Sequence, residues 1–102
     1  MAQLVVTYKT PKDPAAFDKY YAETHIGLAK KIPGLRKYQI NHGPITALAG
    51  ASDAYLVAIL TFDSATAIQA GLASPEGQAA AGDLPNFASG GADLILFDTK
   101  DV

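Results

Sequence analysis

The stretch ETHIGLAKKIPGLRKYQINH, residues 23–42, passes from a helical pattern through a Pro-Gly turn into a strand pattern. Its helical part continues an apolar stripe with steps of three and four residues, as on one face of an α-helix: Phe17, Tyr21, Thr24, Leu28 and Ile32. Pro33 and Gly34 stop this helix at about Lys31. The segment therefore predicts a helix, a tight turn and a strand in direct succession.

Four segments have strand patterns. Residues 3–9 are rich in Val, Thr and Tyr and contain no helix or strand breaker. Residues 36–42 alternate, which predicts a half-buried strand near a sheet edge with Tyr38, Ile40 and His42 on one face. Residues 54–62, AYLVAILTF, and residues 91–99 are apolar on both faces, which is typical of strands covered on both sides.

Helix starts are marked by capping residues. Asp13 precedes Pro14, a cap followed by proline at the first helical position. Asp63 or Ser64 can cap a helix that ends at about Ala73, and Ser74-Pro75-Glu76 opens another that ends by Ser89. The linker GPITALAGASD, residues 43–53, predicts a hairpin loop or lid.

The resulting order is β-α-β-β-α-β, which predicts an α+β protein of the ferredoxin-like, split βαβ class. We expect a single domain over residues 1–102, with both helices on one face of a four-stranded antiparallel sheet. The other face would expose many apolar side chains, each worth roughly 1.5–3 kcal/mol when buried. An identical sheet related by a two-fold axis is the simplest cover, so we expect a homodimer that closes a dimeric α/β barrel.

Composition limits the function. The 102 residues carry a net charge of -2, so no overall positive field attracts nucleic acid or an anionic membrane. The absence of cysteine removes disulfides, thiolate nucleophiles and sulfur metal sites. The first residues do not have a leader pattern, and no apolar run is long enough to span a bilayer. We expect a cytoplasmic protein without a membrane partner.

The two histidines are the first candidates for chemistry. His25 flanks the apolar stripe, where an imidazole can act as a general acid or base toward a ligand between helix and sheet. Counting from the Pro-Gly turn, His25 lies about 12 Å along the helix, whereas His42 lies about 26 Å along the strand. These levels exclude a tight His-His pair. Tyr38 is level with His25, so we predict that these two form the polar centre of a cleft.

Simpler interpretations remain open for these residues. His25 can be a polar boundary residue bonded to a backbone carbonyl, and His42 a surface residue at a strand end. Tyr8, Tyr20, Tyr21 and Tyr55 have the spacing of core aromatics, although a ligand pocket uses the same side chains. Glu23 points about 100° away from His25 around the helix, which makes it a poor orienting partner. Two separated histidines without clustered carboxylates predict no metal site.

The first 42 residues also resemble the EthD-domain family of the dimeric α+β barrel superfamily. The resemblance lies in a helix carrying Phe and Tyr, a His-x-x-Leu step, a Lys-Ile-Pro-Gly-Leu turn, an Arg-x-Tyr strand and a final Asn-His. The matching positions are Phe17, Tyr21, His25, Leu28, Lys31, Ile32, Pro33, Gly34, Leu35, Arg36, Tyr38, Asn41 and His42. Phe62-Asp63 matches a further family feature after the third strand. Gly27 departs from the pattern, because the family often has proline there.

This resemblance implies the barrel fold and the homodimer. It also implies a range of activities without a cofactor, from monooxygenases to isomerases and cyclases, and relatives that handle haem. Our first hypothesis is that the protein binds a small apolar or aromatic, carbonyl-bearing compound between helix one and the sheet. His25 and Tyr38 would be catalytic, and the ligand would contact Tyr21, Leu28, His42 and Tyr55. The alternatives are a non-catalytic binding or accessory protein of an ether-degradation-type catabolic system, and haem ligation by His25.

Overall fold

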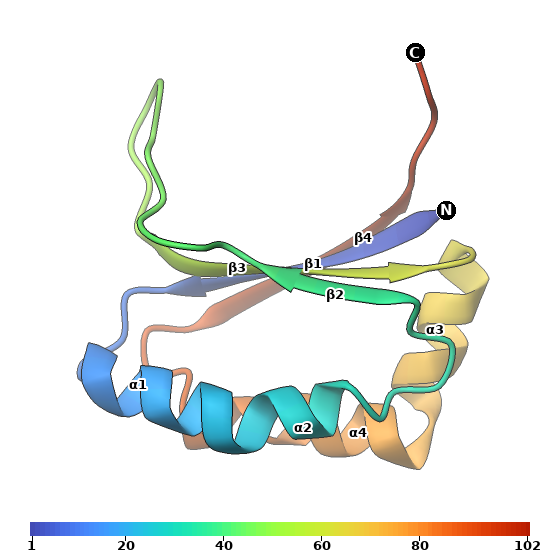
Figure 1. Ribbon diagram of the computed structural model, residues 1–102, viewed down its shortest axis with the longest axis horizontal. Helices are drawn as coiled ribbons and strands as arrows, with labels where there is room; N and C mark the ends of the chain where they lie inside the picture. Colours follow the sequence, from blue (N-terminus) through green and yellow to red (C-terminus); the bar gives the residue numbers. More distant parts are fainter.

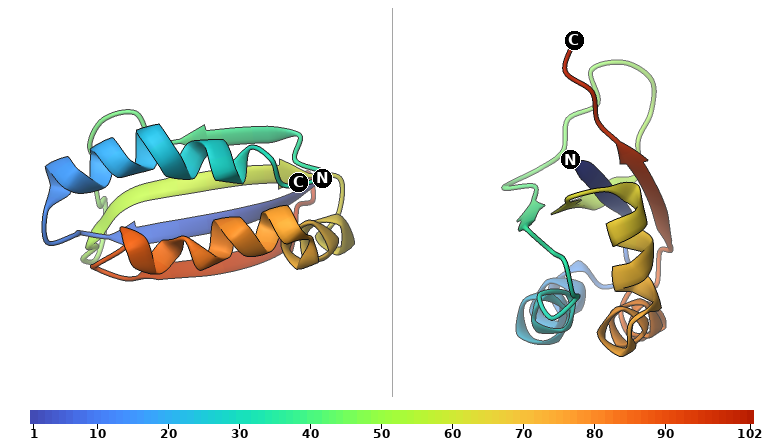
Figure 2. Two further views of the ribbon diagram at one scale, coloured as in Figure 1. Left: turned by 90° about the horizontal axis from the view of Figure 1, so that it is seen from below. Right: turned by 90° about the vertical axis from the view of Figure 1, so that its right-hand side faces the viewer.

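The computed structural model describes all 102 residues and confirms the ferredoxin-like α+β class. Its elements are β1 (Ala2–Lys9), α1 (Pro14–Tyr20), the π-helical turn η1 (Tyr21–His25), α2 (Ile26–Ala29), β2 (Lys37–Ile40), β3 (Ala54–Phe62), α3 (Ala65–Ala73), α4 (Pro75–Gly82), the short 3₁₀ helix η2 (Leu84–Asn86) and β4 (Ala92–Asp98). The strands lie in the order β2-β3-β1-β4, and every neighbouring pair is antiparallel. All the helices cover one face of the sheet (Figures 1 and 2).

The predicted caps start the helices. The side chain of Asp13 accepts a hydrogen bond from the backbone N–H of Ala16, and Pro14 occupies the first turn. Of the two alternatives for α3, Ser64 is the cap, because its hydroxyl accepts from the N–H of Ala67. Ser74 caps α4 in the same way. Satisfying these free N–H groups is what lets short helices begin at these positions.

The first helix differs from the prediction in one turn. The N–H of Ile26 bonds to the carbonyl of Tyr21, an i→i+5 bond that inserts a π turn between α1 and α2. The wider turn keeps residues spaced by four on one face, so the buried positions are Phe17, Tyr21, His25 and Ala29. Thr24, which the three-and-four spacing placed in the stripe, is exposed. His25 is therefore a buried residue and does not merely flank the stripe.

The helix before the Pro-Gly turn and the strand after it are both shorter than predicted. The helix ends at Ala29 and not near Lys31, and β2 ends at Ile40 and not at His42. The side chain of Asn41 donates to the carbonyl of Gly43 and accepts from the N–H of Val57. These bonds turn the chain away from the sheet, which leaves His42 exposed in the following loop.

The two faces of the sheet have different surroundings. Side chains that face the helices form the buried core, including Leu4, Val6, Tyr8, Leu56, Ala58, Leu60 and Phe62. The opposite face is uncovered, and the loop 41–53 and the C-terminus both extend from that side (Figure 1). Strand register places five apolar side chains on this uncovered face: Val5, Val57, Ile59, Ile95 and Phe97. Among them Ile95 is 58% exposed and Phe97 43% exposed.

Candidate functional site

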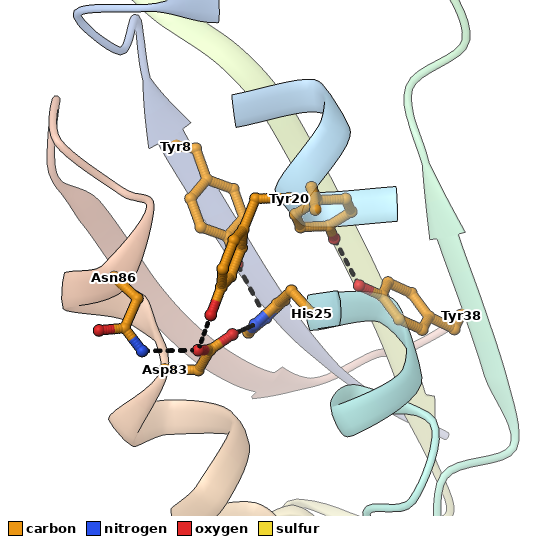
Figure 3. Close-up of polar contacts among 7 residues, drawn as sticks. Tyr8, Tyr20, His25, Tyr38, Asp83 and Asn86 are labelled. Atoms are coloured by element: carbon orange, nitrogen blue, oxygen red, sulfur yellow. Dashed lines mark hydrogen bonds and ion pairs between the residues drawn. The ribbon is translucent and has the colours of Figure 1, made fainter. Parts of the chain in front are cut away.

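His25 lies beneath the sheet, where its two ring nitrogens meet different partners (Figure 3). Nδ1 is 3.0 Å from Oδ2 of Asp83, and Nε2 is 3.4 Å from the hydroxyl of Tyr8. The His25 side chain is only 6% exposed. The π turn directs the ring inward from helix one, Asp83 follows the end of α4, and Tyr8 comes from β1. Three separate elements therefore contribute to one buried polar cluster.

Asp83 is the most heavily hydrogen-bonded side chain of this cluster. Its Oδ1 accepts from the hydroxyl of Tyr20 at 2.6 Å and from Nδ2 of Asn86 at 2.9 Å, while Oδ2 faces His25. Burial by itself raises the pKa of the Asp83 carboxyl, but the hydrogen bonds from Tyr20, Asn86 and His25 outweigh it and hold that pKa below its usual range. Asp83 is therefore ionised at neutral pH.

Aromatic rings enclose the imidazole. The ring of Phe87 lies 4.6 Å from that of His25 between centroids, and Tyr21 lies 5.4 Å away. The ring of Tyr8 meets His25 edge-on at 6.4 Å. Because these rings fill the space around it, the imidazole has little freedom to turn over and exchange the positions of its two nitrogens.

A second polar pair lies nearby. The hydroxyls of Tyr21 and Tyr38 are hydrogen-bonded to each other, which joins helix one to β2. Burial raises the pKa of Tyr38. Burial, with Tyr38 and Asp83 nearby, raises the pKa of Tyr8, and burial, with Tyr38 and Tyr8 nearby, raises that of Tyr21. All three phenols are thus neutral at neutral pH and keep their O–H groups. Only one of the two hydroxyls donates in this hydrogen bond. The O–H of the other phenol is therefore free to donate to another group.

Each member of this phenol pair lines a different pocket, Tyr38 an inner one and Tyr21 an outer one. The inner pocket has a volume of about 40 Å³ and contains Tyr8, His25 and Tyr38, and nearly all its other walls are Leu, Ile, Val and Ala side chains. That volume suits one or two water-sized groups. The outer groove has a volume of about 560 Å³ and runs between helix one, β2, β3 and the start of the loop 41–53. Its size is within the range of small-molecule sites, roughly 300–1,000 Å³.

The predicted site residues are divided between these spaces. His25 and Tyr38 line the inner pocket together, although Tyr38 bonds to Tyr21 and not to His25. Tyr21 and Tyr55 line the outer groove. Leu28 lies elsewhere, in a shallow depression with Lys31 and Glu76. His42 is exposed and lines neither space.

Sequence reasoning missed Asp83 and Asn86, and it considered Tyr8 and Tyr20 only as core or pocket aromatics and not as partners of His25 or Asp83. Asp83 ends an Ala-rich helix, where an aspartate is usually a surface residue, and nothing in its local pattern indicates a histidine partner. The spacing of four from Phe17 through Tyr21 to His25 was the one available signal that His25 is buried. No group of three or more His, Cys, Asp or Glu side chains is placed to hold a metal ion. No helix is both long and apolar enough to cross a bilayer.

These features define a small ferredoxin-like protein with a buried His-Asp pair under an open antiparallel sheet. The chain belongs to the EthD family, because the family model named EthD domain matches residues 9–91. A protein from the thcB-thcC intergenic region of Rhodococcus erythropolis is 39% identical over 103 residues, covering 100% of this chain and 98% of that protein.

Solved structures agree with this assignment. An ethyl tert-butyl ether (EthD) family protein of Bacillus halodurans superimposes with a TM-score of 0.86 at 32% identity, covering 98% of this chain and 99% of that chain. Two more distant structures share the fold alone. SnoaB of Streptomyces nogalater, a cofactor-independent oxygenase, has a TM-score of 0.66 at 21% identity and covers 99% and 94% of the two chains. A dimeric ferredoxin-like protein of Thermobifida fusca has a TM-score of 0.67 at 14% identity and covers 96% and 90%.

Proposed function

We propose that two copies of this chain associate through the uncovered sheet face. Ile95 and Phe97 are large apolar side chains left in contact with water, and patches of this kind usually mark an association surface. On the same face the Oε1 atom of Gln3 is buried without a hydrogen-bond partner. A second copy would cover the apolar side chains and bring polar groups within reach of Gln3. The Thermobifida protein of the same fold is dimeric, which supports the proposal of a homodimer.

Each subunit then binds a small, largely apolar compound that carries a carbonyl group. The outer groove has room for the body of the compound, and the inner pocket has room only for its reactive end. The observation that carries this proposal is the shared lining of the inner pocket. The imidazole of His25 and the phenols of Tyr8 and Tyr38 are the hydrogen-bonding side chains in walls that are otherwise Leu, Ile, Val and Ala.

The chemistry that fits is proton transfer next to the carbonyl. The unused O–H of the Tyr21-Tyr38 pair donates to the carbonyl oxygen and stabilises negative charge as it develops there. His25 takes a proton from the adjacent carbon. In an isomerisation it returns this proton at another position of the ligand; in a cyclisation the carbanion attacks a second carbonyl carbon of the same ligand, whose C=O π bond opens, and His25 gives the proton to that oxygen. A cofactor-free oxygenation is the third possibility: the electron-rich enolate reduces dissolved O₂, one oxygen atom bonds to the ligand carbon and the other leaves as water. SnoaB is an oxygenase of this kind on the same fold.

A second candidate function is non-catalytic binding. The chain would hold the same compound in the same cleft as an accessory protein of a catabolic system of the ether-degradation type, with His25 serving only as a hydrogen-bond partner. The Rhodococcus relative supports this candidate in one respect, because it is encoded between two other genes, thcB and thcC, as an accessory protein of a gene cluster would be.

Deuterium exchange into an aromatic ketone distinguishes the two functions. We expect the wild-type protein in D₂O to accelerate exchange at the acidic carbon of 2-tetralone, followed by proton NMR. A His25→Gln variant should retain binding and lose the acceleration by roughly 10²-fold or more, the usual contribution of acid-base catalysis. His42→Gln is the matched control, because His42 is exposed and lies outside both pockets. Binding without acceleration by the wild type would favour the accessory function.

A further inference from the structure

We propose that Asp83 is the positioning residue of this site: it holds His25 in the Nδ1–H tautomer, so that Nε2 is the atom that exchanges protons with the ligand. This inference rests on the proposed function, because the choice of nitrogen matters for function only if His25 transfers a proton. The tautomer itself can be measured without any ligand.

The groups in contact with the Asp83 carboxylate lead to this assignment. An ionised carboxylate has no hydrogen to donate, so each of its contacts must be a donor. Tyr20 and Asn86 supply two donors at Oδ1. At Oδ2 the contact is Nδ1 of His25, 3.0 Å away. Nδ1 must therefore carry the hydrogen, and a neutral imidazole then has its lone pair on Nε2.

The Nε2 side has the properties of the reactive end. Its partner, the Tyr8 hydroxyl, is 3.4 Å away, at the long limit for a hydrogen bond, so this contact is weak and readily replaced. Tyr8 and His25 both line the inner pocket, whereas Asp83 does not. A ligand carbon in the inner pocket would thus meet Nε2, while the Asp83 side of the ring stays closed.

The remaining surroundings contain no competing charge. The titratable groups that face His25 are Asp83 after α4, Tyr8 on β1, Tyr21 on its own helix and Tyr38 on β2, and the three phenols are neutral. No lysine or arginine lines the inner pocket. Asp83 is therefore the one charged group in contact with the imidazole, and the tilted contact with the Phe87 ring helps to keep the imidazole in that orientation.

Nitrogen-15 NMR of the imidazole rings tests the assignment. The chain has two histidines, so a long-range ¹H–¹⁵N spectrum contains two ring systems, and exposed His42 is an internal reference. At a pH where both rings are neutral, we expect His25 to favour the Nδ1–H form by at least ten to one. Nε2–H as the major form of His25, or an equal mixture of both forms, overturns the proposal.

The variant Asp83→Asn makes a sharper prediction. Tyr20 and Asn86 both donate at the Oδ1 position, so the amide oxygen of the introduced side chain must lie there. Its NH₂ group then faces Nδ1 and forces that nitrogen to accept a hydrogen bond. We expect the His25 tautomer to invert to Nε2–H with the fold retained. Asp63→Asn, at an exposed aspartate paired with Arg36, should leave both histidine signals unchanged.

The outcomes separate this inference from the proposed function. An uninverted tautomer in a folded Asp83→Asn protein overturns the positioning role. If that variant does not fold, the wild-type tautomer still decides the matter. Inversion together with loss of 2-tetralone exchange supports both proposals. If the tautomer inverts but the wild type never accelerates exchange, Asp83 orients the ring as stated and the catalytic function fails.

Discussion

The Nδ1 atom of His25 lies 3.0 Å from Oδ2 of Asp83 although the two residues are 58 positions apart in the chain. One side chain comes from the π turn of helix one, and the other follows the end of α4. Their contact links the two helical segments across the inner face of the sheet (Figures 2 and 3). It therefore serves both the stability of the helical layer and the orientation of the imidazole.

Asp83→Ala should destabilise the protein strongly. The change leaves the donors of Tyr20, Asn86 and His25 without their shared acceptor. Leaving one buried donor without its acceptor costs about 1–3 kcal/mol, and three donors are affected, so we expect the free energy of unfolding in urea to fall by at least that amount. Asp63→Ala is the control, because its pair with Arg36 is exposed. A loss no larger than that of the control would show that the Asp83 cluster is not stabilising.

Acid should weaken the fold through the same carboxylate. The folded pKa of Asp83 is below its usual range, so the stabilisation is complete above the unfolded pKa of about 3.9. It is lost as pH falls from there through the lower folded pKa. Urea unfolding measured from neutral pH to about pH 3 should thus show a steeper loss in wild type than in Asp83→Asn. Equal slopes would mean that folding does not lower the pKa of Asp83.

The sheet face can be tested by light scattering. Wild type should have the mass of two chains of 10.6 kDa. Ile95→Asp places a charge on the uncovered face and should give the mass of a single chain. Ile40→Asp is the matched control, because Ile40 is exposed to a similar degree but lies on the helical face of the sheet. A wild-type mass of one chain at micromolar concentration contradicts the proposed homodimer.

The phenol pair should contribute to ligand affinity. Tyr38→Phe and Tyr21→Phe each remove the hydrogen bond between the two hydroxyls, and a neutral hydrogen bond is worth about 0.5–1.5 kcal/mol. Calorimetric titration with 2-tetralone should show affinity reduced about two- to tenfold in either variant. The double variant should lose little more, because the two hydroxyls act as one unit. Fully additive losses would mean that the phenols act independently.

Most of the fold could be predicted from the sequence, because its signals are local. Pro14, Ser74 and the Pro33-Gly34 turn mark element ends by their backbone properties. The segment 54–62 is the strand β3 with the predicted bounds. The uncovered apolar face also followed from strand alternation alone. The π turn could not be predicted in this way. A period of 3.6 residues places Thr24 on the buried face, whereas the buried positions of the folded helix are four residues apart.

The site could be predicted only in part, since its partners are distant in the chain. His25 and Tyr38 could be placed at one level by counting residues from the turn. Asp83 could not be linked to His25 without the tertiary fold. Asp83 and Phe87 hold the imidazole of His25 from outside its own helix. The sequence pattern paired Tyr38 with His25, whereas in the structure Tyr38 is hydrogen-bonded to Tyr21, one turn earlier on helix one.

A crystal structure of the protein with 2-tetralone tests the proposed site most directly. The account predicts the ketone with its ring in the outer groove, its oxygen within hydrogen-bond distance of the Tyr38 or Tyr21 hydroxyl, and its acidic carbon facing Nε2 of His25. Ketone density confined to the surface near Leu28 or His42, with the Tyr21-Tyr38 bond intact, would contradict it.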